Sequence, residues 1–362
     1  MKAISLEDLR RFAVARSFGP PTSLERAINA LGFVQADPIR APARAQDLTL
    51  RHRVRDYRAG DLERLYPTLD IEEDNFINYG FLTRAVHALM HPRMRPARRS
   101  KRHRERTQAV LEFVRERGAA HPREVDRHFS HGTVTNYWGG SSSATTHMLS
   151  HMHYDGLLRV ARREEGVRVY GAYDRPFEAA PDDDESRRAR VDAMVDVVVR
   201  KYAPLPSASL SAVINRLRYA APQYQSDLKS AQRRARERLS HARVEGVDWY
   251  WPADEAPGAE GSPETVRLLT PFDPLVWDRR RFELFWAWAY RFEAYTPKPK
   301  RRFGYYALPM LWRERVIGWA NVSVTRGACA AEFGYVQSPP RDRVFRRELS
   351  HELDRMRAFL VP

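Results

Sequence analysis

The sequence predicts a mainly α-helical fold with some β-structure, built from tandem winged helix-turn-helix units followed by a C-terminal β-barrel-like domain. Three helical stretches and a β-hairpin occur in the middle of the chain, and a similar order repeats after them. Beyond residue 264, short β-rich runs separated by turns replace the helical periodicity. The 362 residues allow several compact units. We expect domains at 1–92, 93–180, 181–255 and 265–362.

In the N-terminal unit, apolar residues recur at helical spacing over 5–18 and over 22–31. A short extended piece at 33–35 follows, and further helices are expected within 41–52 and 61–66. This order matches a winged-helix unit without an obvious wing.

The second unit opens on a block of positive charge, 93–108, which leads into a helix at 107–117. Two more helices are expected at 121–129 and 141–156. Residues 157–174 then predict two strands joined by a Glu-Glu-Gly turn. This hairpin is the expected wing, and its arginines are candidates for DNA contact: Arg159, Arg162, Arg163 and Arg168.

An acidic stretch, 181–186, marks the next boundary. Helices are expected at 189–202, 208–220 and 226–240, and 244–252 supplies strand-like residues in the position of a wing. The third unit therefore repeats the order of the second.

The composition of 254–264 is that of a linker. Short β-rich runs follow between 266 and 336, and an aromatic stretch at 279–295 is expected to be a helix packed on them. This pattern predicts a small β-barrel or sheet covered by one helix.

The balance of charge points to a polyanionic partner. The chain has 61 lysines and arginines against 46 aspartates and glutamates, a formal net charge of +15. Such an excess favours DNA or RNA. The single cysteine, Cys329, excludes disulfides within the chain and cysteine-based zinc sites. The N-terminal helix is amphipathic and no segment approaches roughly 20 apolar residues, so we expect a cytosolic protein.

Gln35-Ala36-Asp37 is the most suggestive short motif. On an extended backbone the amide and the carboxylate point to the same face. Together they can hold a water molecule against an electron-poor carbon, while nearby arginines hold phosphates. A structural alternative explains the same residues, because Asp37 before Pro38 is a common start of a helix. The two explanations are compatible.

Other polar groups have structural explanations. His147, His151 and His153 suggest a metal site, but the pattern indicates no further ligand, so contact with a DNA groove or phosphate is the better hypothesis. Asp273 precedes Pro274 as a turn or cap residue would.

Three further groups of polar side chains also have candidate roles. Ser141 to Ser143 suggest a turn or a helix cap. Asp278 lies among arginines and suggests an ion pair. Lys298, Lys300, Arg301 and Arg302 form a basic turn suited to phosphate contact.

A long motif runs through residues 268–311: PFD, then DR-R, then E-Y-P-K-R-GYY-LP. It resembles the C-terminal block of the AlkZ/YcaQ-like family of bacterial DNA glycosylases. Residues 34–54 resemble its catalytic segment, and 157–175 resemble its second winged helix. The Gln-x-Asp form of the motif is nearer the YcaQ-like branch. Departures occur at Arg40 and at Gln46-Asp47, where the family often carries asparagine and a histidine pair.

The resemblance implies a monofunctional glycosylase that hydrolyses the N-glycosidic bond of purines alkylated at N7 or N3 and, in some members, unhooks interstrand crosslinks. It implies Gln35 and Asp37 as the catalytic pair, no metal or other cofactor, and a monomer acting on double-stranded DNA. The alternatives are a winged-helix regulator without catalysis and a nucleic-acid hydrolase of another type. The residues expected to contact DNA are Arg40, Arg44, Arg51, Arg53, Arg159, Arg162, Arg163, Arg168, Lys298, Lys300, Arg301 and Arg302.

Overall fold

The computed structural model describes residues 3–93, 100–130, 132–135, 141–175, 177, 183–258, 263–325 and 328–361. It divides into two compact units, each assembled from stretches that are distant in sequence. Unit 1 consists of Met1–Leu62, Val195–Asn215 and Lys229–Pro362, and unit 2 consists of Glu63–Met194 and Arg216–Leu228. No helix in these described ranges is long and apolar enough to cross a lipid bilayer.

The N-terminal part of unit 1 consists of short helices around one strand. The first helix starts at a capping box, in which Ser5 Oγ accepts from the Asp8 N–H at 3.1 Å and the Asp8 carboxylate accepts from the Ser5 N–H at 2.9 Å. The second ends at Gly32, whose φ of +62° favours glycine. The elements are α1 (Leu6–Ser17), α2 (Leu24–Leu31), β1 (Phe33–Gln35), α3 (Ala45–Leu50) and, at the boundary with unit 2, α4 (Asp61–Leu65).

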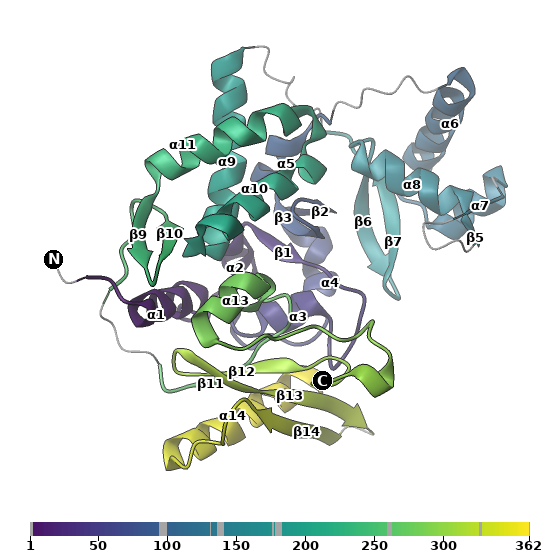
Figure 1. Cartoon of the computed structure of the whole chain (residues 1–362). Helices are drawn as coiled ribbons and strands as arrows, with labels where there is room; N and C mark the ends of the chain where they lie inside the picture. Colours follow the sequence, from purple (N-terminus) through teal and green to yellow (C-terminus); the bar gives the residue numbers. More distant parts are fainter. Residues whose placement is uncertain are drawn as a thin grey trace. The chain divides into compact units, whose positions relative to one another are not determined.

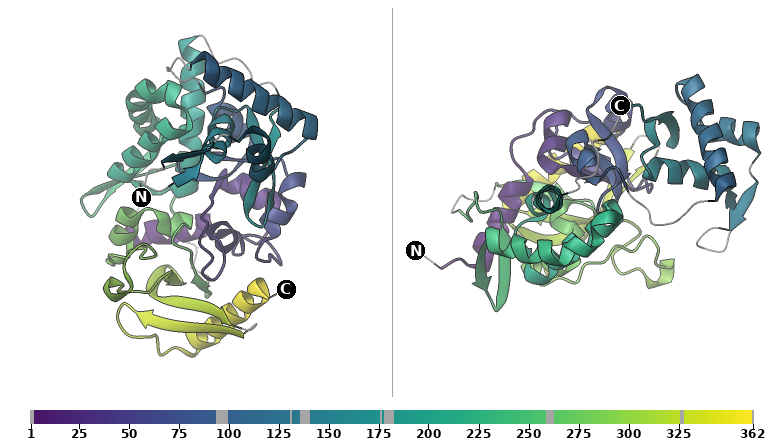
Figure 2. Two further views of the ribbon diagram at one scale, coloured as in Figure 1. Left: turned by 90° about the vertical axis from the view of Figure 1, so that its right-hand side faces the viewer. Right: turned by 90° about the horizontal axis from the view of Figure 1, so that it is seen from above.

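A curled antiparallel sheet in the order β11-β12-β13-β14 forms the C-terminal part of unit 1, with α14 packed against β11 and β14 (Figures 1 and 2). Aromatic rings fill the core beside it, and the Trp249 and Phe285 rings stack with centroids 4.8 Å apart. The elements are β11 (Val266–Leu268), α12 (Pro274–Trp277), α13 (Arg279–Trp286), η3 (Lys298–Lys300), β12 (Leu308–Trp312), β13 (Arg315–Thr325), β14 (Ala328–Tyr335) and α14 (Arg343–Leu360).

In the sequence between these two parts, β8, β9 and β10 form a three-stranded sheet in the order β8-β10-β9, which belongs to unit 1. Three helices of this stretch contribute residues to both units because the boundaries fall within them. The elements are α9 (Asp184–Tyr202), β8 (Leu205–Pro206), α10 (Ser207–Ala220), η2 (Pro222–Asp227), α11 (Leu228–Arg238), β9 (Ser240–Val244) and β10 (Val247–Trp251).

In its described residues, unit 2 contains three antiparallel strand pairs, β2–β3, β4–β5 and β6–β7, and α6, α7 and α8 lie beside the last of them (Figures 1 and 2). The Tyr66 hydroxyl donates to the Val160 carbonyl at 3.0 Å and so joins η1 to β6. The elements are η1 (Tyr66–Thr68), β2 (Ile71–Asn75), β3 (Tyr79–Thr83), α5 (Arg84–Met90), α6 (Lys101–Arg117), α7 (Pro122–Phe129), β4 (Thr133–Thr135), β5 (Ser141–Ser143), α8 (Ala144–Tyr154), β6 (Leu158–Glu164) and β7 (Val167–Ala172).

The structure confirms the hairpin expected at 157–174 and, within 244–252, one strand, β10. Its partner β9 begins earlier, at Ser240, because the helix expected to reach residue 240 ends at Arg238. The helix expected at 279–295 is wrong beyond Trp286, because Ala287 adopts a left-handed conformation that ends α13. After it, Trp288 packs across Phe282 and Trp319 at centroid distances of 5.7 Å. Packing of these rings replaces the helix.

The β2–β3 hairpin was not predicted, because β2 has the sequence Ile-Glu-Glu-Asp-Asn and its acidic residues hide the pattern of a strand. Parts of three other predictions lie outside the described residues: 94–99 of the basic block, 181–182 of the acidic stretch and 259–262 of the linker.

Candidate active site

Gln35 is the last residue of β1, so the extended backbone is confirmed up to Gln35, whereas Ala36 and Asp37 lie beyond the strand. That the two side chains share one face stays a prediction. The helix expected to start at Asp37-Pro38 is wrong, because the next helix of the chain, α3, begins at Ala45. Asp37 Oδ1 instead accepts from the Ile39 N–H at 2.9 Å and closes a local turn. Asp37 is therefore held by its own loop, with its second carboxylate oxygen outside that turn.

Gln46 in the first turn of α3 supports the Asp37 backbone. Its Oε1 accepts from the Asp37 N–H at 3.3 Å, and its side chain is buried. The neighbouring Asp47 accepts from the Tyr57 hydroxyl at 2.7 Å and from the Gly60 N–H at 3.2 Å. Gln46 and Asp47, where the chain departs from its resembled family, are thus structural in this protein. The third departure, Arg40, is exposed. An amide nine residues after an aspartate gives no signal that sequence reasoning could use.

Partial burial raises the pKa of the Asp37 carboxyl, and the hydrogen bond from Ile39 opposes that rise. The charge of Asp37 in turn affects the pKa of two tyrosines from the C-terminal part of unit 1. Burial and the Asp37 charge both raise the pKa of Tyr295, and the same two causes act on Tyr306. The Tyr306 hydroxyl also lies 3.2 Å from Thr270 Oγ1. The site therefore combines β1 with a loop some 260 positions later in the chain.

That loop is aromatic and basic. Tyr295 is 80% exposed, and its ring contacts Phe292 with centroids 6.1 Å apart, while Phe292 lies 5.2 Å from Tyr306. Glu293 accepts from the backbone N–H groups of Arg302 and Phe303 at 2.8 and 2.7 Å, which fixes the loop. Its exposed cations include Arg291, Lys298, Lys300 and Arg302. The Arg301 guanidinium lies over the Tyr305 ring at 5.0 Å, and that of Arg302 over the Phe303 ring at 5.8 Å.

The arginines that follow the Gln-x-Asp motif have different environments. Arg40 is exposed, but Arg44, Arg51 and Arg53 are buried. Arg51 pairs with Glu352, and Arg53 pairs with Asp273 at 2.9 Å. Asp273 is also the N-cap of α12, as expected, and Asp278 caps α13 by accepting from the Arg280 and Arg281 N–H groups. DNA contact by these arginines stays a prediction.

In unit 2, the hairpin arginines mostly contact acidic or aromatic side chains of the same unit. Arg159 pairs with Glu72 at 3.0 Å, and Arg163 pairs with Glu73 at 2.6 Å. Arg168 lies over the Tyr79 ring at 4.0 Å, and Arg162 pairs with the exposed Glu164 at 2.6 Å. Their contact with DNA also stays a prediction, but two of these arginines neutralise buried carboxylates of β2.

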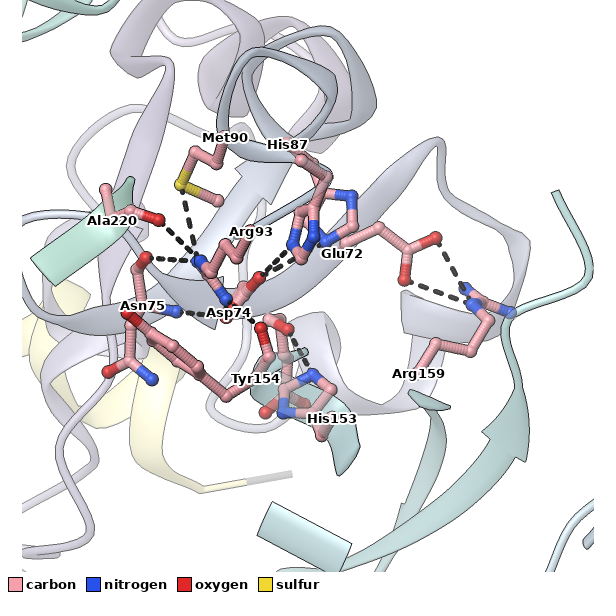
Figure 3. Close-up of polar contacts among 12 residues, drawn as sticks. Glu72, Asp74, Asn75, His87, Met90, Arg93, His153, Tyr154, Arg159 and Ala220 are labelled. Atoms are coloured by element: carbon pink, nitrogen blue, oxygen red, sulfur yellow. Dashed lines mark hydrogen bonds and ion pairs between the residues drawn. The ribbon is translucent and has the colours of Figure 1, made fainter. Parts of the chain in front are cut away.

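The third acidic residue of β2, Asp74, is the centre of a buried polar cluster that the sequence did not reveal (Figure 3). His91 Nε2 lies 2.9 Å and His87 Nε2 3.3 Å from Asp74 Oδ2, and Arg93 donates to Oδ1 at 2.9 Å. Burial would raise the pKa of Asp74, but these neighbours hold it well below its usual range. Burial lowers the pKa of His91 to about 3, so this imidazole is neutral.

The ligand atoms of Asp74, His87 and His91 lie within 4.8 Å of one another, which is close enough for one metal ion. Two observations favour a hydrogen-bonded cluster instead. Arg93 already supplies a positive charge to the carboxylate. The Nδ1 atoms of both histidines have no hydrogen-bond partner among the described residues, whereas metal-bound histidines usually donate their second N–H to a fixed acceptor.

The helix α8 places the other conspicuous histidines. His153 is buried and its Nε2 lies 2.8 Å from the Glu73 carbonyl, while His147 and His151 have ring centroids 6.5 Å apart. Ser143 caps α8 by accepting from the Thr146 N–H, as the cap hypothesis expected. His153 is thus a structural residue.

Two comparisons with known proteins bear on the fold and the family of this chain. DNA glycosylase AlkZ of Streptomyces sahachiroi is similar over 100% of this chain and 99% of its own, with a TM-score of 0.65 and 13% sequence identity, a likeness of mixed α/β fold. A family model for DNA glycosylases of the AlkZ-like type matches residues 28–359, nearly the whole chain, including the Gln-x-Asp motif and the aromatic loop. The chain therefore belongs to the AlkZ-like family of DNA N-glycosylases, enzymes that act on DNA.

Proposed function

We propose that unit 1 carries the excision centre, with Asp37 and Gln35 as its catalytic residues and purines alkylated at N7 or N3 as its substrates. One observation carries the proposal: a half-buried carboxylate with a raised pKa lies beside an exposed aromatic and basic loop. Partial burial weakens the hydration of Asp37 and so raises its pKa, and the loop offers a ring to bases and cations to phosphates.

The chemistry suits these groups. A purine alkylated at N7 or N3 is cationic, so it leaves as the C1′–N9 bond breaks without a strong general acid. The electron pair of that bond goes to the base, and the sugar becomes oxocarbenium-like. Asp37 stabilises this positive charge and takes the proton of the water that attacks C1′, while Gln35 orients the water. The Gln-x-Asp form of the pair supports a position of the enzyme nearer the YcaQ-like branch, which is part of the same proposal.

The finer architecture is part of the same proposal. The order α6, α7, α8 and then β6–β7 supports a winged helix, and α9, α10 and α11 followed by β9–β10 support another. We propose these within domains 93–180 and 181–255. The N-terminal domain 1–92 precedes them, and the curled sheet β11–β14 gives 265–362 its barrel-like character.

The proposed substrate is alkylated double-stranded DNA, bound by a monomer in the bacterial cytosol, where the nucleoid lies. Unhooking of interstrand crosslinks is the second proposed activity. A crosslinked base cannot leave the stack freely, and the exposure of Tyr295 supports a site that acts on a base from an open surface.

The test is single-turnover excision on a duplex with one N7-methylguanine, followed by alkaline cleavage of abasic sites. Asp37→Asn should lower the excision rate by about 10²- to 10⁴-fold, which is the usual contribution of a proton-transfer group to catalysis. The matched control is Asp354→Asn, which changes an exposed carboxylate on α14 and should keep the wild-type rate. Wild-type excision with an unchanged Asp37→Asn rate would reject Asp37 as the base.

Two further results would redirect the proposal. Strand breaks without alkali would indicate a different hydrolase. A duplex crosslinked through guanine N7 atoms, resolved on a denaturing gel, tests unhooking: wild type should release single strands and Asp37→Asn should not.

A further inference from the structure

A small cavity in unit 1 lies among basic side chains. It has a volume of about 210 Å³, and Arg16, Arg53, Arg200 and Lys201 line it together with small or apolar residues such as Gly19 and Ala30. No acidic residue is part of this lining. A recess with cationic walls and no carboxylate of its own is suited to an anion.

Lys201 is the least compensated of these cations. It is buried in the last turn of α9, and its Nζ donates to the Phe33 carbonyl. In the described ranges it forms no ion pair, and the end of α9 supplies only partial negative charge. Burial, and then the charge of Arg53, lower the pKa of Lys201 to about 7, while Asp273 opposes this.

The two neighbouring arginines retain donors that no described residue uses. Arg53 gives Nη1 and Nη2 to Asp273 at 2.9 and 3.3 Å, yet its buried Nε has no hydrogen-bond partner within the described part of the chain. Arg16 gives Nη1 to Glu255 at 2.9 Å and Nη2 to the Arg200 carbonyl at 2.7 Å, and its buried Nε is also unsatisfied by the residues that the structure describes. Buried unsatisfied N–H groups are costly, so an acceptor at this place would be stabilised.

We propose that this cavity is a binding site for a phosphate group, held by Lys201 and Arg53 with Arg16 beside them. A phosphate supplies oxygens to ammonium and guanidinium donors, and charge-assisted bonds of this kind are the strong ones. The volume suffices for one tetrahedral anion and a few waters at roughly 30 Å³ each. The phosphate group can come from free inorganic phosphate or from the backbone of a nucleic acid. The proposal does not depend on the excision chemistry.

The first test is thermal unfolding of the full chain in inorganic phosphate and in chloride at equal ionic strength. Phosphate should raise Tm in a saturable way, because a ligand that binds only the folded state stabilises it. Lys201→Met should remove the phosphate-specific rise. The matched control is Lys229→Met, which removes an exposed lysine of α11 and should keep that rise. Equal Tm in phosphate and chloride would overturn the proposal.

A second measurement needs no variant and covers the case in which Lys201→Met does not fold. NMR of lysine Nζ in the wild-type chain should show one amine that titrates near pH 7 and whose pKa rises by at least one unit in saturating phosphate. An amine that titrates there and ignores phosphate would overturn the proposal.

A competition distinguishes the two sources of the phosphate group. If the cavity receives a backbone phosphate, saturation with a short undamaged duplex should abolish the additional Tm rise that inorganic phosphate causes. If the cavity receives a free anion, the rise in Tm caused by the duplex and the rise caused by inorganic phosphate should add. Loss of the phosphate-specific rise in Lys201→Met is required in both cases.

Discussion

Asp37 in unit 1 and Asp74 in unit 2 are two aspartates placed at or just after a strand, and they have opposite environments. Asp37 is half-buried, accepts a backbone N–H from Ile39, and has a raised pKa. Asp74 is fully buried, its oxygens are occupied by His87, His91 and Arg93, and its pKa is held well below the usual range. The number of donors around each carboxylate, rather than burial alone, sets the direction of the shift.

The difference separates a carboxylate that is suited to chemistry from one that is suited to structure. A raised pKa means that ionised Asp37 lowers the stability of the fold, an effect relieved as pH falls through that pKa. The lowered pKa of Asp74 means the reverse: it contributes stability above its unfolded pKa of about 3.9, and this is lost as pH falls through the folded pKa. Basic residues of the two units differ in a similar way. Arg163 of unit 2 forms an ion pair with Glu73, whereas Lys298 of unit 1 is exposed to solvent.

The largest effect should come from Asp74→Asn. It leaves the buried guanidinium of Arg93 without its countercharge, so the free energy of unfolding should fall by about 3–5 kcal/mol. Urea denaturation followed by circular dichroism measures this. Asp37→Asn is the comparison and should unfold at or above the wild-type urea concentration. A loss below 1 kcal/mol for Asp74→Asn would contradict the structural role.

Tyr295→Ala should weaken binding to alkylated duplex by about 1–3 kcal/mol, the usual worth of an aromatic ring stacked on a base. Tyr295→Phe keeps the ring and should bind within twofold of wild type, which separates stacking from the hydroxyl group. Fluorescence anisotropy with labelled duplex provides the affinities. Equal affinities of Tyr295→Ala and wild type would remove this ring from the DNA surface.

Reversal of the exposed loop charges tests the contrast between paired and unpaired cations. In the variant Lys298→Glu with Lys300→Glu, the slope of log affinity against log salt should become shallower by about 2, since each phosphate contact contributes about 0.9. Arg162→Glu, on the exposed part of the hairpin, should change the slope by one contact at most. A larger change for Arg162→Glu than for the loop variant would make the hairpin the principal contact.

The smallest effect concerns pH. Excision requires ionised Asp37, so the rate should fall as pH drops through its pKa, and the midpoint should lie above the ordinary aspartate value of about 3.9. Single-turnover rates corrected for uncatalysed depurination measure it. The residual rate of Asp37→Asn should lack this acid limb. A midpoint at or below the ordinary value would contradict the raised pKa.

Local patterns were reliable where neighbouring residues decide the conformation. The extended piece ending at Gln35, the Glu-Glu-Gly turn of the hairpin and the cap at Asp273 follow from short-range sterics and hydrogen bonds. The strand β2 was missed because its acidic residues are stabilised by Arg159 and Arg163, which follow about 90 residues later. A short window of sequence does not contain those partners.

By itself the sequence determined the basic charge, the hairpin at 157–174 and the amide–carboxylate pair Gln35 and Asp37. Tertiary structure alone decided that Asp37 is bonded within its own turn rather than capping a helix, that Gln46 supports it, and that Tyr295 and Tyr306 sense its charge. The physical reason is that burial and electrostatic neighbourhood depend on residues brought together across hundreds of positions, whereas charge and local periodicity are carried by each residue and its neighbours.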